Sequence, residues 1–257
     1  MCGGAIGTAR WRGVRLCDVL EDAGVRDGAA HVAFQAVDEA PEAEPPQAFG
    51  ASISLSKARS EEVLLAWQMN DEPLRREHGG PLRVVVPGYT GARSVKWLTQ
   101  VTVQAQPSDN YFQARSYRIF PADTDPATAP AELGLPLNQL AVNSAILAPA
   151  DGAHVVSGGV EVLGYAIAGD GRRVERVDVS PDGGGSWRQA ELLDDLGPWA
   201  WRRWRTEVDL PVGTQEVIAR AWDSAATQQV ERPESTWNPK GYANNAWPRV
   251  RVHAGGG

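Results

Sequence analysis

Short apolar segments separated by polar turns run along most of the chain. In the first 120 residues two patterns alternate. Apolar positions at helical spacing in 10–23 predict a helix that stops at Gly24, whereas 31–37, 82–88 and 94–105 have the alternation or the continuous apolar run of strands. The segment 61–70 is apolar without a decisive period. This mixture predicts an α+β fold for residues 1–120.

A different pattern begins at Asn143. Alternating segments are separated by glycine, proline and aspartate turns at a spacing of roughly ten residues, which predicts about seven strands in a β-sandwich over 143–254. Between the two patterns, residues 121–142 contain four prolines and little periodicity. We interpret that stretch as an interdomain linker or a segment that wraps around a domain.

Charge and composition narrow the classes of function. The formal net charge of -7 argues against nucleic-acid binding but leaves a small-anion site possible, since such a site needs only a few converging cations. No run approaches the roughly eighteen apolar residues of a membrane span, and the N-terminus lacks the pattern of a signal peptide. As written, the chain is therefore expected in the cytoplasm and away from membranes. The histidines and the two cysteines show no metal-ligand spacing.

Two features have a structural and a functional interpretation. Seven of the ten tryptophans lie after residue 142, where sandwich core, a carbohydrate-binding surface and a dimer contact are all open alternatives. Arg93 and Lys96 follow directly on the buried strand that contains the run 84–86. They are either solvated loop charges or part of an anion site.

The order of motifs along the chain resembles one family. From the N-terminus it reads GAIGTARWRGVRLCDVLEDAG, HVAFQAVD, FGASISL, VLLAWQMN, REHGGPLRVVVPGYTGARSVKWL, SYRIFP and WNPKGYANNAWPRVRV. These segments are similar to the sulfite oxidase family of molybdopterin enzymes, which includes the eukaryotic assimilatory nitrate reductases. The resemblance implies that residues 1–120 are the C-terminal part of a molybdenum-cofactor domain. It also implies that residues 143–254 are an immunoglobulin-like dimerisation domain, and hence a homodimer.

The resemblance assigns roles to particular residues. Lys96 matches a lysine that holds the phosphate of the molybdopterin cofactor, and Asp38 an aspartate on the polar edge of the pterin. The full set of cofactor-binding matches is Asp38, His78, Arg83, Ser94, Val95 and Lys96. Tyr117 matches the catalytic tyrosine, which also binds substrate and relays a proton.

Lys240, in WNPKG, matches a substrate-binding position that is typically arginine in sulfite oxidases and uncharged in nitrate reductases. A cation is kept, although the bidentate fork of arginine is lost, so a sulfite-type pocket is favoured. Arg93 and Arg115 are further candidates to line it. We expect Lys96, His78, Arg83, Lys240 and Tyr117 to converge on one cleft between the two domains.

The implied function is molybdopterin-dependent oxidation of sulfite, or a similar small oxyanion, to sulfate. Electrons would pass to an external acceptor such as a cytochrome, and no haem-binding region is visible in this chain. The family's metal-ligating cysteine precedes the segment matched by GAIGTARW, and neither Cys2 nor Cys17 matches it, so no metal ligand is assigned. We therefore expect an N-terminally truncated chain that is inactive as written, whose compartment an upstream export signal could change to the periplasm. The alternative is a catalytically inactive, dimerising binding protein that retains a relic anion pocket.

Overall fold

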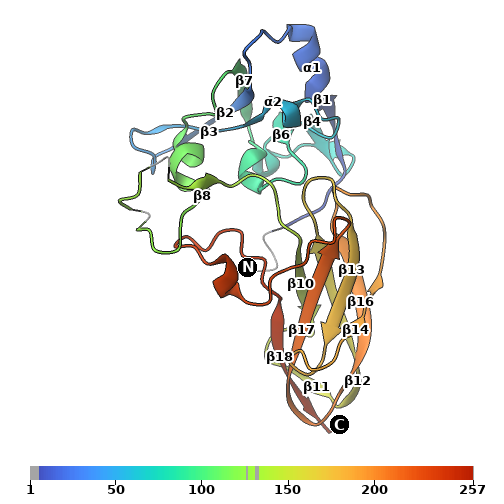
Figure 1. Ribbon diagram of the computed structural model, residues 1–257. Coiled ribbons are helices and arrows are strands. Elements are labelled where there is room, and N and C mark those ends of the chain that lie inside the picture. The colour runs from blue at the N-terminus through green and yellow to red at the C-terminus, as the bar shows by residue number, and fades with distance from the viewer. Residues whose placement is uncertain (1–5, 126, 131–132, 257) are drawn as a thin grey trace. The chain divides into compact units, whose positions relative to one another are not determined.

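The computed structural model describes residues 6–125, 127–130 and 133–256, which divide into two compact units (Figure 1). The first, here called the N-terminal unit, consists of Ala9–Gln139 together with the short segment Asn238–Tyr242. The second, here called the sandwich unit, contains residues 140–237 and 243–256 with the described residues that precede Ala9. The segment that carries Lys240 thus packs with the N-terminal unit, although it lies between two parts of the sandwich unit in the sequence.

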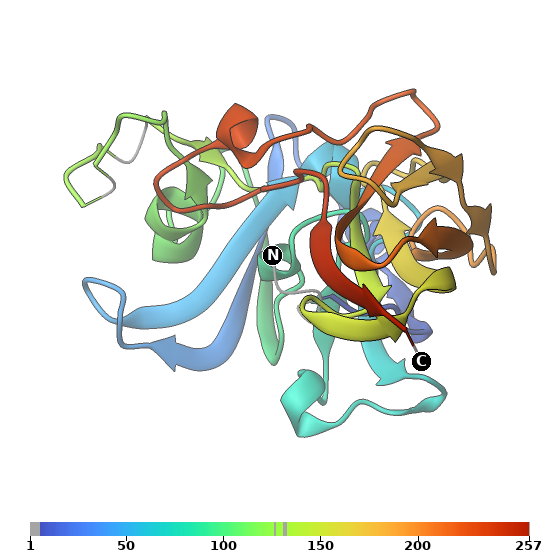
Figure 2. The same cartoon turned by 90° about the horizontal axis from the view of Figure 1, so that it is seen from below.

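The N-terminal unit is built on two antiparallel sheets. One has the order β1-β4-β5, with β6 also paired to β4, and the other has the order β3-β2-β7. Their strands are β1 (Trp11–Arg15), β2 (His31–Ala40), β3 (Gln47–Ser54), β4 (Leu64–Met69), β5 (Glu72–Pro73), β6 (Arg83–Val85) and β7 (Leu98–Gln104). Figure 2 shows β2 and β3 (blue) side by side, as their antiparallel register requires.

The strand patterns of this unit follow from burial on one face. In β2, Val32, Phe34 and Ala36 are buried in a core cluster, whereas Gln35 is exposed. Helix α1 (Leu16–Ala23) adds Leu16 and Leu20 to the same cluster. Residues 10–15 depart from the predicted helix, because 11–15 pair with β4 as an edge strand and the helix begins only at Leu16.

Short elements complete the N-terminal unit. They are α2 (Leu55–Ala58), the 3-10 turns Arg76–His78 and Gly91–Arg93, the π-helix Phe112–Ser116, β8 (Arg118–Ile119) and β9 (Leu135–Pro136). The proline-rich segment packs along this unit near its C-terminal end: β9 pairs with β8, and the carbonyl of Asn138 accepts a hydrogen bond from the Thr90 amide at 2.8 Å.

The sandwich unit has two facing sheets with the orders β10-β12-β16-β15 and β11-β18-β17-β13-β14. The strands are β10 (Asn143–Ala148), β11 (Ala153–Val156), β12 (Gly158–Ile167), β13 (Val174–Ser180), β14 (Arg188–Gln189), β15 (Glu191–Leu192), β16 (Arg202–Leu210), β17 (Gly213–Asp223) and β18 (Arg249–Gly255). One further 3-10 turn, Pro233–Thr236, follows β17. All pairs within these sheets are antiparallel except β11 with β18.

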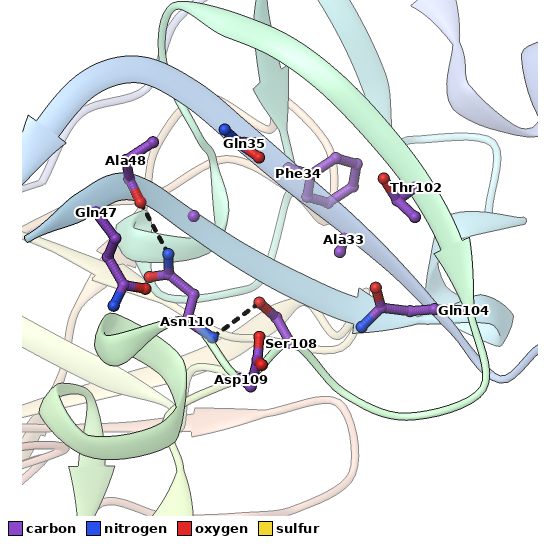
Figure 3. Close-up of a pocket in the computed structure, with 11 residues that line it drawn as sticks. Ala33, Phe34, Gln35, Gln47, Ala48, Thr102, Gln104, Ser108, Asp109 and Asn110 are labelled. Atoms are coloured by element: carbon purple, nitrogen blue, oxygen red, sulfur yellow. Dashed lines mark hydrogen bonds between the residues drawn. The ribbon is translucent and has the colours of Figure 1, made fainter. Parts of the chain in front are cut away.

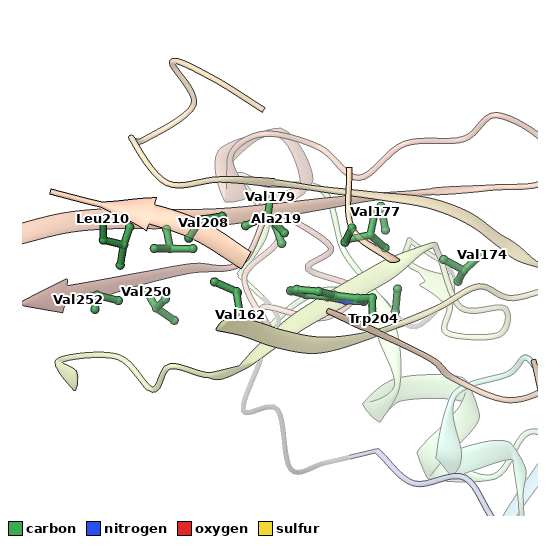
Figure 4. Close-up of a cluster of buried hydrophobic side chains, with 14 of the residues drawn as sticks. Val162, Val174, Val177, Val179, Trp204, Val208, Leu210, Ala219, Val250 and Val252 are labelled. Atoms are coloured by element: carbon green, nitrogen blue, oxygen red, sulfur yellow. The ribbon is translucent and has the colours of Figure 1, made fainter. Parts of the chain in front are cut away.

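The core of the sandwich is an apolar cluster to which both sheets contribute (Figure 4). Trp204 on β16 is fully buried and lies in register with Gly164 on β12. A Cβ at Gly164 would come 2.1 Å from Cζ2 of Trp204, so the indole occupies the space that a side chain there would need. Trp187 instead stacks with Arg220, whose Cζ lies 3.7 Å from the ring centre. Trp204 therefore belongs to the core, whereas Trp187 belongs to a half-buried cation–π group.

The described residues form mostly strands, with two α-helices of eight and four residues. The expected α+β mixture is therefore realised in part, since the helical share is small. None of the helices within the described residues has the length and apolar content needed to cross a bilayer.

Candidate functional site

Arg83, at the start of β6, forms hydrogen bonds with two loops that contain predicted cofactor-binding residues. Its Nη1 donates to the carbonyl of His78 at 2.8 Å and its Nη2 to the carbonyl of Ser94 at 3.0 Å. Its guanidinium also stacks over Trp11, with Cζ 5.0 Å from the ring centre. Burial lowers the pKa of Arg83, because desolvation disfavours the charged form. These bonds hold the backbones of His78 and Ser94 in place.

Lys96 is fixed against the same loop. Its Nζ donates to the carbonyl of Glu77 at 3.1 Å and lies 4.2 Å from the ring centre of Trp97. Gly79, at φ +101°, lets the two loops approach, since a Cβ there would lie 2.7 Å from Cβ of Lys96. An ammonium has three donors, so Lys96 keeps N–H groups for a ligand while its stem is held by packing.

Two neighbours of Lys96 in the loop contribute through the backbone and the core. Ser94 Oγ accepts a hydrogen bond from the amide of Val86 at 3.0 Å. Val95 is buried, and its carbonyl accepts a bond from the Val84 amide at 2.8 Å. These two hydrogen bonds therefore hold the loop after β6 against that strand. They position Lys96, which lies at the end of the loop.

Asp38 lies beside this loop, because the Val37 amide donates to the carbonyl of Trp97 at 3.0 Å. Oδ1 of Asp38 is buried and has no hydrogen-bond partner among the described residues. An unsatisfied buried acceptor is costly and is rare in folded proteins. The oxygen is therefore available to a ligand that brings an N–H or O–H donor.

Tyr117 and Lys240 form a second group, at the end of the π-helix Phe112–Ser116. Lys240 Nζ donates to the carbonyls of Arg115 at 3.0 Å and Ser116 at 2.7 Å, the residues that directly precede Tyr117. A cation at a helix C-terminus satisfies carbonyls that have no partner within the helix. Burial lowers the pKa of Lys240, because desolvation disfavours the charged ammonium.

The aromatic surroundings of this group include a residue that sequence reasoning missed. The ring of Tyr117 packs against Phe112, with centroids 6.1 Å apart, and against Tyr242 at 5.9 Å. Tyr242 follows Lys240 by two residues, so the WNPKGY motif itself was the available signal. A phenol can bind an anion as a donor, and the site thus holds two phenols and an ammonium.

Arg93 and Arg115 do not both line this group as expected. Arg115 is exposed, whereas Arg93 is completely buried and its Nε donates to Oδ1 of Asn138 at 3.1 Å. Desolvation, together with the nearby charge of Arg118, lowers the pKa of Arg93 to about 10. Arg93 therefore lies inside the unit, where its Nη1 and Nη2 are buried without a hydrogen-bond partner among the described residues, and its place in the anion pocket stays a prediction.

The predicted residues thus fall into two groups within the N-terminal unit. One holds Asp38, His78, Arg83, Ser94, Val95 and Lys96, and the other holds Tyr117 and Lys240. The loop that contains Arg93 and Lys96 connects them, because Arg93 is within electrostatic range of Tyr117. No described contact joins Lys96 directly to Tyr117, and their convergence on a cleft between domains stays a prediction.

A third feature, a hollow of about 290 Å³, contains none of the predicted residues (Figure 3). Carboxamide and hydroxyl side chains line it above a floor of small residues on β2 and β3. Asn110 donates from Nδ2 to the carbonyl of Ala48 at 2.8 Å, and its amide bonds to Ser108 Oγ at 3.2 Å. The alternation of apolar and polar residues in β2 predicts a sheet face that is open to solvent. It does not predict the loop that covers the edge of this face.

Comparison with known proteins decides the family. The model of the oxidoreductase molybdopterin binding domain matches residues 1–112, and that of the Mo-co oxidoreductase dimerisation domain matches 135–255. Sulfite oxidase of Arabidopsis thaliana is 42% identical over 98% of this chain and 68% of its own length. The chain belongs to the sulfite oxidase family of molybdopterin oxidoreductases.

Other relatives agree in name and in fold. Mitochondrial sulfite oxidase of Mus musculus is 46% identical over 97% of this chain and 47% of that protein, so the chain spans about half the length of such relatives. Among solved structures, the sulfane dehydrogenase SoxCD of Paracoccus pantotrophus matches with a TM-score of 0.83 and 26% identity, over 95% of this chain and 60% of that one.

The chemistry of the first group fits the cofactor of the sulfite oxidase family. The unsatisfied oxygen of Asp38 suits the N–H edge of a pterin, and the ammonium of Lys96 suits a phosphate oxygen. Of the two cysteines, Cys17 has its Sγ 3.6 Å from Oδ1 of Asp18 on α1, and Cys2 falls outside the described residues, so the expectation that neither is a metal ligand stays a prediction. Across the described ranges, no group of three or more potential metal ligands comes together.

Proposed function

We propose that this chain is part of an enzyme that oxidises sulfite to sulfate with a molybdopterin cofactor. In that reaction sulfite gains an oxygen atom derived from water, and two protons and two electrons are released. The molybdenum cofactor, when bound, supplies the redox chemistry. The residues of this chain bind the cofactor and the anion, and Tyr117 relays a proton.

The proposal is carried by one observation: the ammonium of Lys240 lies at the end of the π-helix, next to the backbone of Tyr117. Lys240 Nζ is held 2.7 Å from the carbonyl of Ser116, the residue before Tyr117. A cation and an O–H donor side by side suit a small oxyanion. Because no ion pair with Lys240 occurs in the described part of the chain, its charge is not already neutralised by a carboxylate.

Substrate choice follows from the charge of the site. Sulfite carries between one and two negative charges near neutral pH, whereas nitrate carries one, so a retained cation favours the sulfur oxyanion. The names of the relatives point the same way, since sulfite oxidase and sulfane dehydrogenase both act on sulfur. The dimerisation-domain match supports a homodimer, and we infer an external electron acceptor such as a cytochrome.

The test uses the protein purified from its host with its cofactor. We expect molybdenum in the protein and sulfite-dependent reduction of ferricyanide. Lys240→Met should raise KM for sulfite by about tenfold and lower kcat less, because it removes charge-based binding. Arg26→Met, which removes an exposed cation of the same unit, is the matched control. Protein without molybdenum and without turnover would instead favour a dimerising binding protein with a relic anion pocket.

A further inference from the structure

Tyr242 and Lys240 project from a single braced turn. Asn238 Nδ2 donates to the carbonyl of Tyr242 at 2.7 Å, and its Oδ1 accepts from the Tyr242 amide at 3.2 Å. The Gly241 amide also bonds to the carbonyl of Asn238 at 2.8 Å, with Gly241 at φ +65°. Because Asn238 is almost completely buried, these bonds hold the backbone of the turn from which both side chains extend.

The turn brings the ring of Tyr242 onto that of Tyr117. Their centroids are 5.9 Å apart and the planes are inclined by 39°. Burial is the main cause that raises the pKa of Tyr242, followed by the nearby phenol of Tyr117, while a hydrogen bond with the Ser116 side chain acts in the opposite direction. The phenol of Tyr242 therefore stays protonated well above neutral pH and serves as a donor rather than as a base.

Lys240 alone is a weak anchor for an anion in this geometry. Two of its three N–H donors are used by the carbonyls of Arg115 and Ser116, so one remains for a ligand. An anion held by one N–H and by Tyr117 would lack a third donor. Tyr242 is the neighbouring side chain that can supply it from the same turn.

We propose that Tyr242 is a second substrate-binding phenol, which joins Tyr117 and Lys240 in a three-donor site for a pyramidal or tetrahedral sulfur oxyanion. This inference rests on the proposed function for the identity of the anion. Two O–H donors and one N–H donor match an anion whose oxygens point in three directions. Planar, singly charged nitrate satisfies such a set less well.

The experiment measures binding of inorganic sulfate by calorimetry to the host-purified protein and to Tyr242→Phe. Loss of a hydrogen bond to a charged group should weaken sulfate binding about tenfold while nitrate binding changes less. In the steady state, KM for sulfite should rise by a similar factor with a smaller change in kcat. Tyr165→Phe, which removes a phenol in the sandwich unit, is the matched control and should leave sulfate affinity unchanged.

Two outcomes would overturn the inference: unchanged sulfate affinity in Tyr242→Phe, or no sulfate binding by the parent protein. Circular dichroism and thermal midpoints show whether each variant is folded, and Tyr242→Trp, which keeps an aromatic ring without the hydroxyl, gives a second reading. If sulfate binding falls in Tyr242→Phe but the cofactor-loaded parent does not oxidise sulfite, the proposed function fails and the anion site stands. If the parent oxidises sulfite with unchanged constants in Tyr242→Phe, only the role of Tyr242 fails.

Discussion

At the scale of single residues, Lys240 has a structural role in addition to the binding role proposed for it. Its bonds to the carbonyls of Arg115 and Ser116 cap the π-helix, and its remaining donor is available to an anion. The sequence motif located this lysine, but the helix-capping role depends on a contact across 124 and 125 residues that no local pattern encodes. Tyr242 lies two residues after Lys240 in the same motif, but its packing against Tyr117 is likewise a contact between segments remote in the sequence.

The first prediction concerns the pH dependence of anion binding. Burial lowers the pKa of Lys240, so its charge is lost as pH rises through that lowered value. As the pH is raised, sulfate affinity should therefore begin to fall at a lower pH than it would if Lys240 were exposed to solvent. Lys240→Arg should keep its affinity to higher pH, because guanidinium remains charged. A calorimetric series over pH checks this, and identical profiles for the two proteins would contradict it.

At the scale of elements, the sequence located most strands but not all boundaries. The alternation in 31–37 identified β2, which extends to Ala40. Residues 10–15 have helical spacing yet form β1, because pairing with β4 outweighs local periodicity at a sheet edge. The predicted strand 94–105 begins only at Leu98, since Trp97 adopts φ +49° and interrupts the extended backbone.

The second prediction concerns the pairing of β12 with β16. Gly164→Ala should destabilise the sandwich unit by about 2–4 kcal/mol, because its Cβ would occupy the position of the buried Trp204 ring. Urea unfolding followed by tryptophan fluorescence measures the change. Gly152→Ala, at a turn where a Cβ meets nothing within 4 Å, is the comparison, although its φ of +77° adds a smaller strain of its own. Equal stability of the two variants would show that the indole can move aside.

At the scale of the whole molecule, the two units differ in how much of their structure could be predicted from the sequence. The sandwich unit follows from regular alternation and evenly spaced turns, which is why its sheets could be anticipated. The N-terminal unit depends on loops such as Gly91–Lys96, whose conformation is set by remote partners like Asn138. The cofactor-binding residues were therefore reached through the family resemblance, and periodicity alone would have left them as surface loop charges.

The third prediction concerns assembly. The dimerisation-domain match to residues 135–255 leads us to expect a two-fold symmetric dimer of the host-purified protein. Sedimentation equilibrium over a range of micromolar concentrations measures the mass. Lys240→Met should sediment as the parent does, since that residue packs in the N-terminal unit. A single species with the mass of one chain would contradict the expectation.

The five-residue excursion Asn238–Tyr242 has a consequence for how the protein is made. Tyr117 emerges from the ribosome long before Lys240 and Tyr242, and the bonds from Lys240 to Arg115 and Ser116 close a loop of more than a hundred residues. Closing such a loop costs entropy, so these contacts should form late in folding. A nascent or prematurely terminated chain that stops short of residue 238 would retain the phenol and lack the ammonium. The proposed anion site thus requires a chain that extends at least through Tyr242.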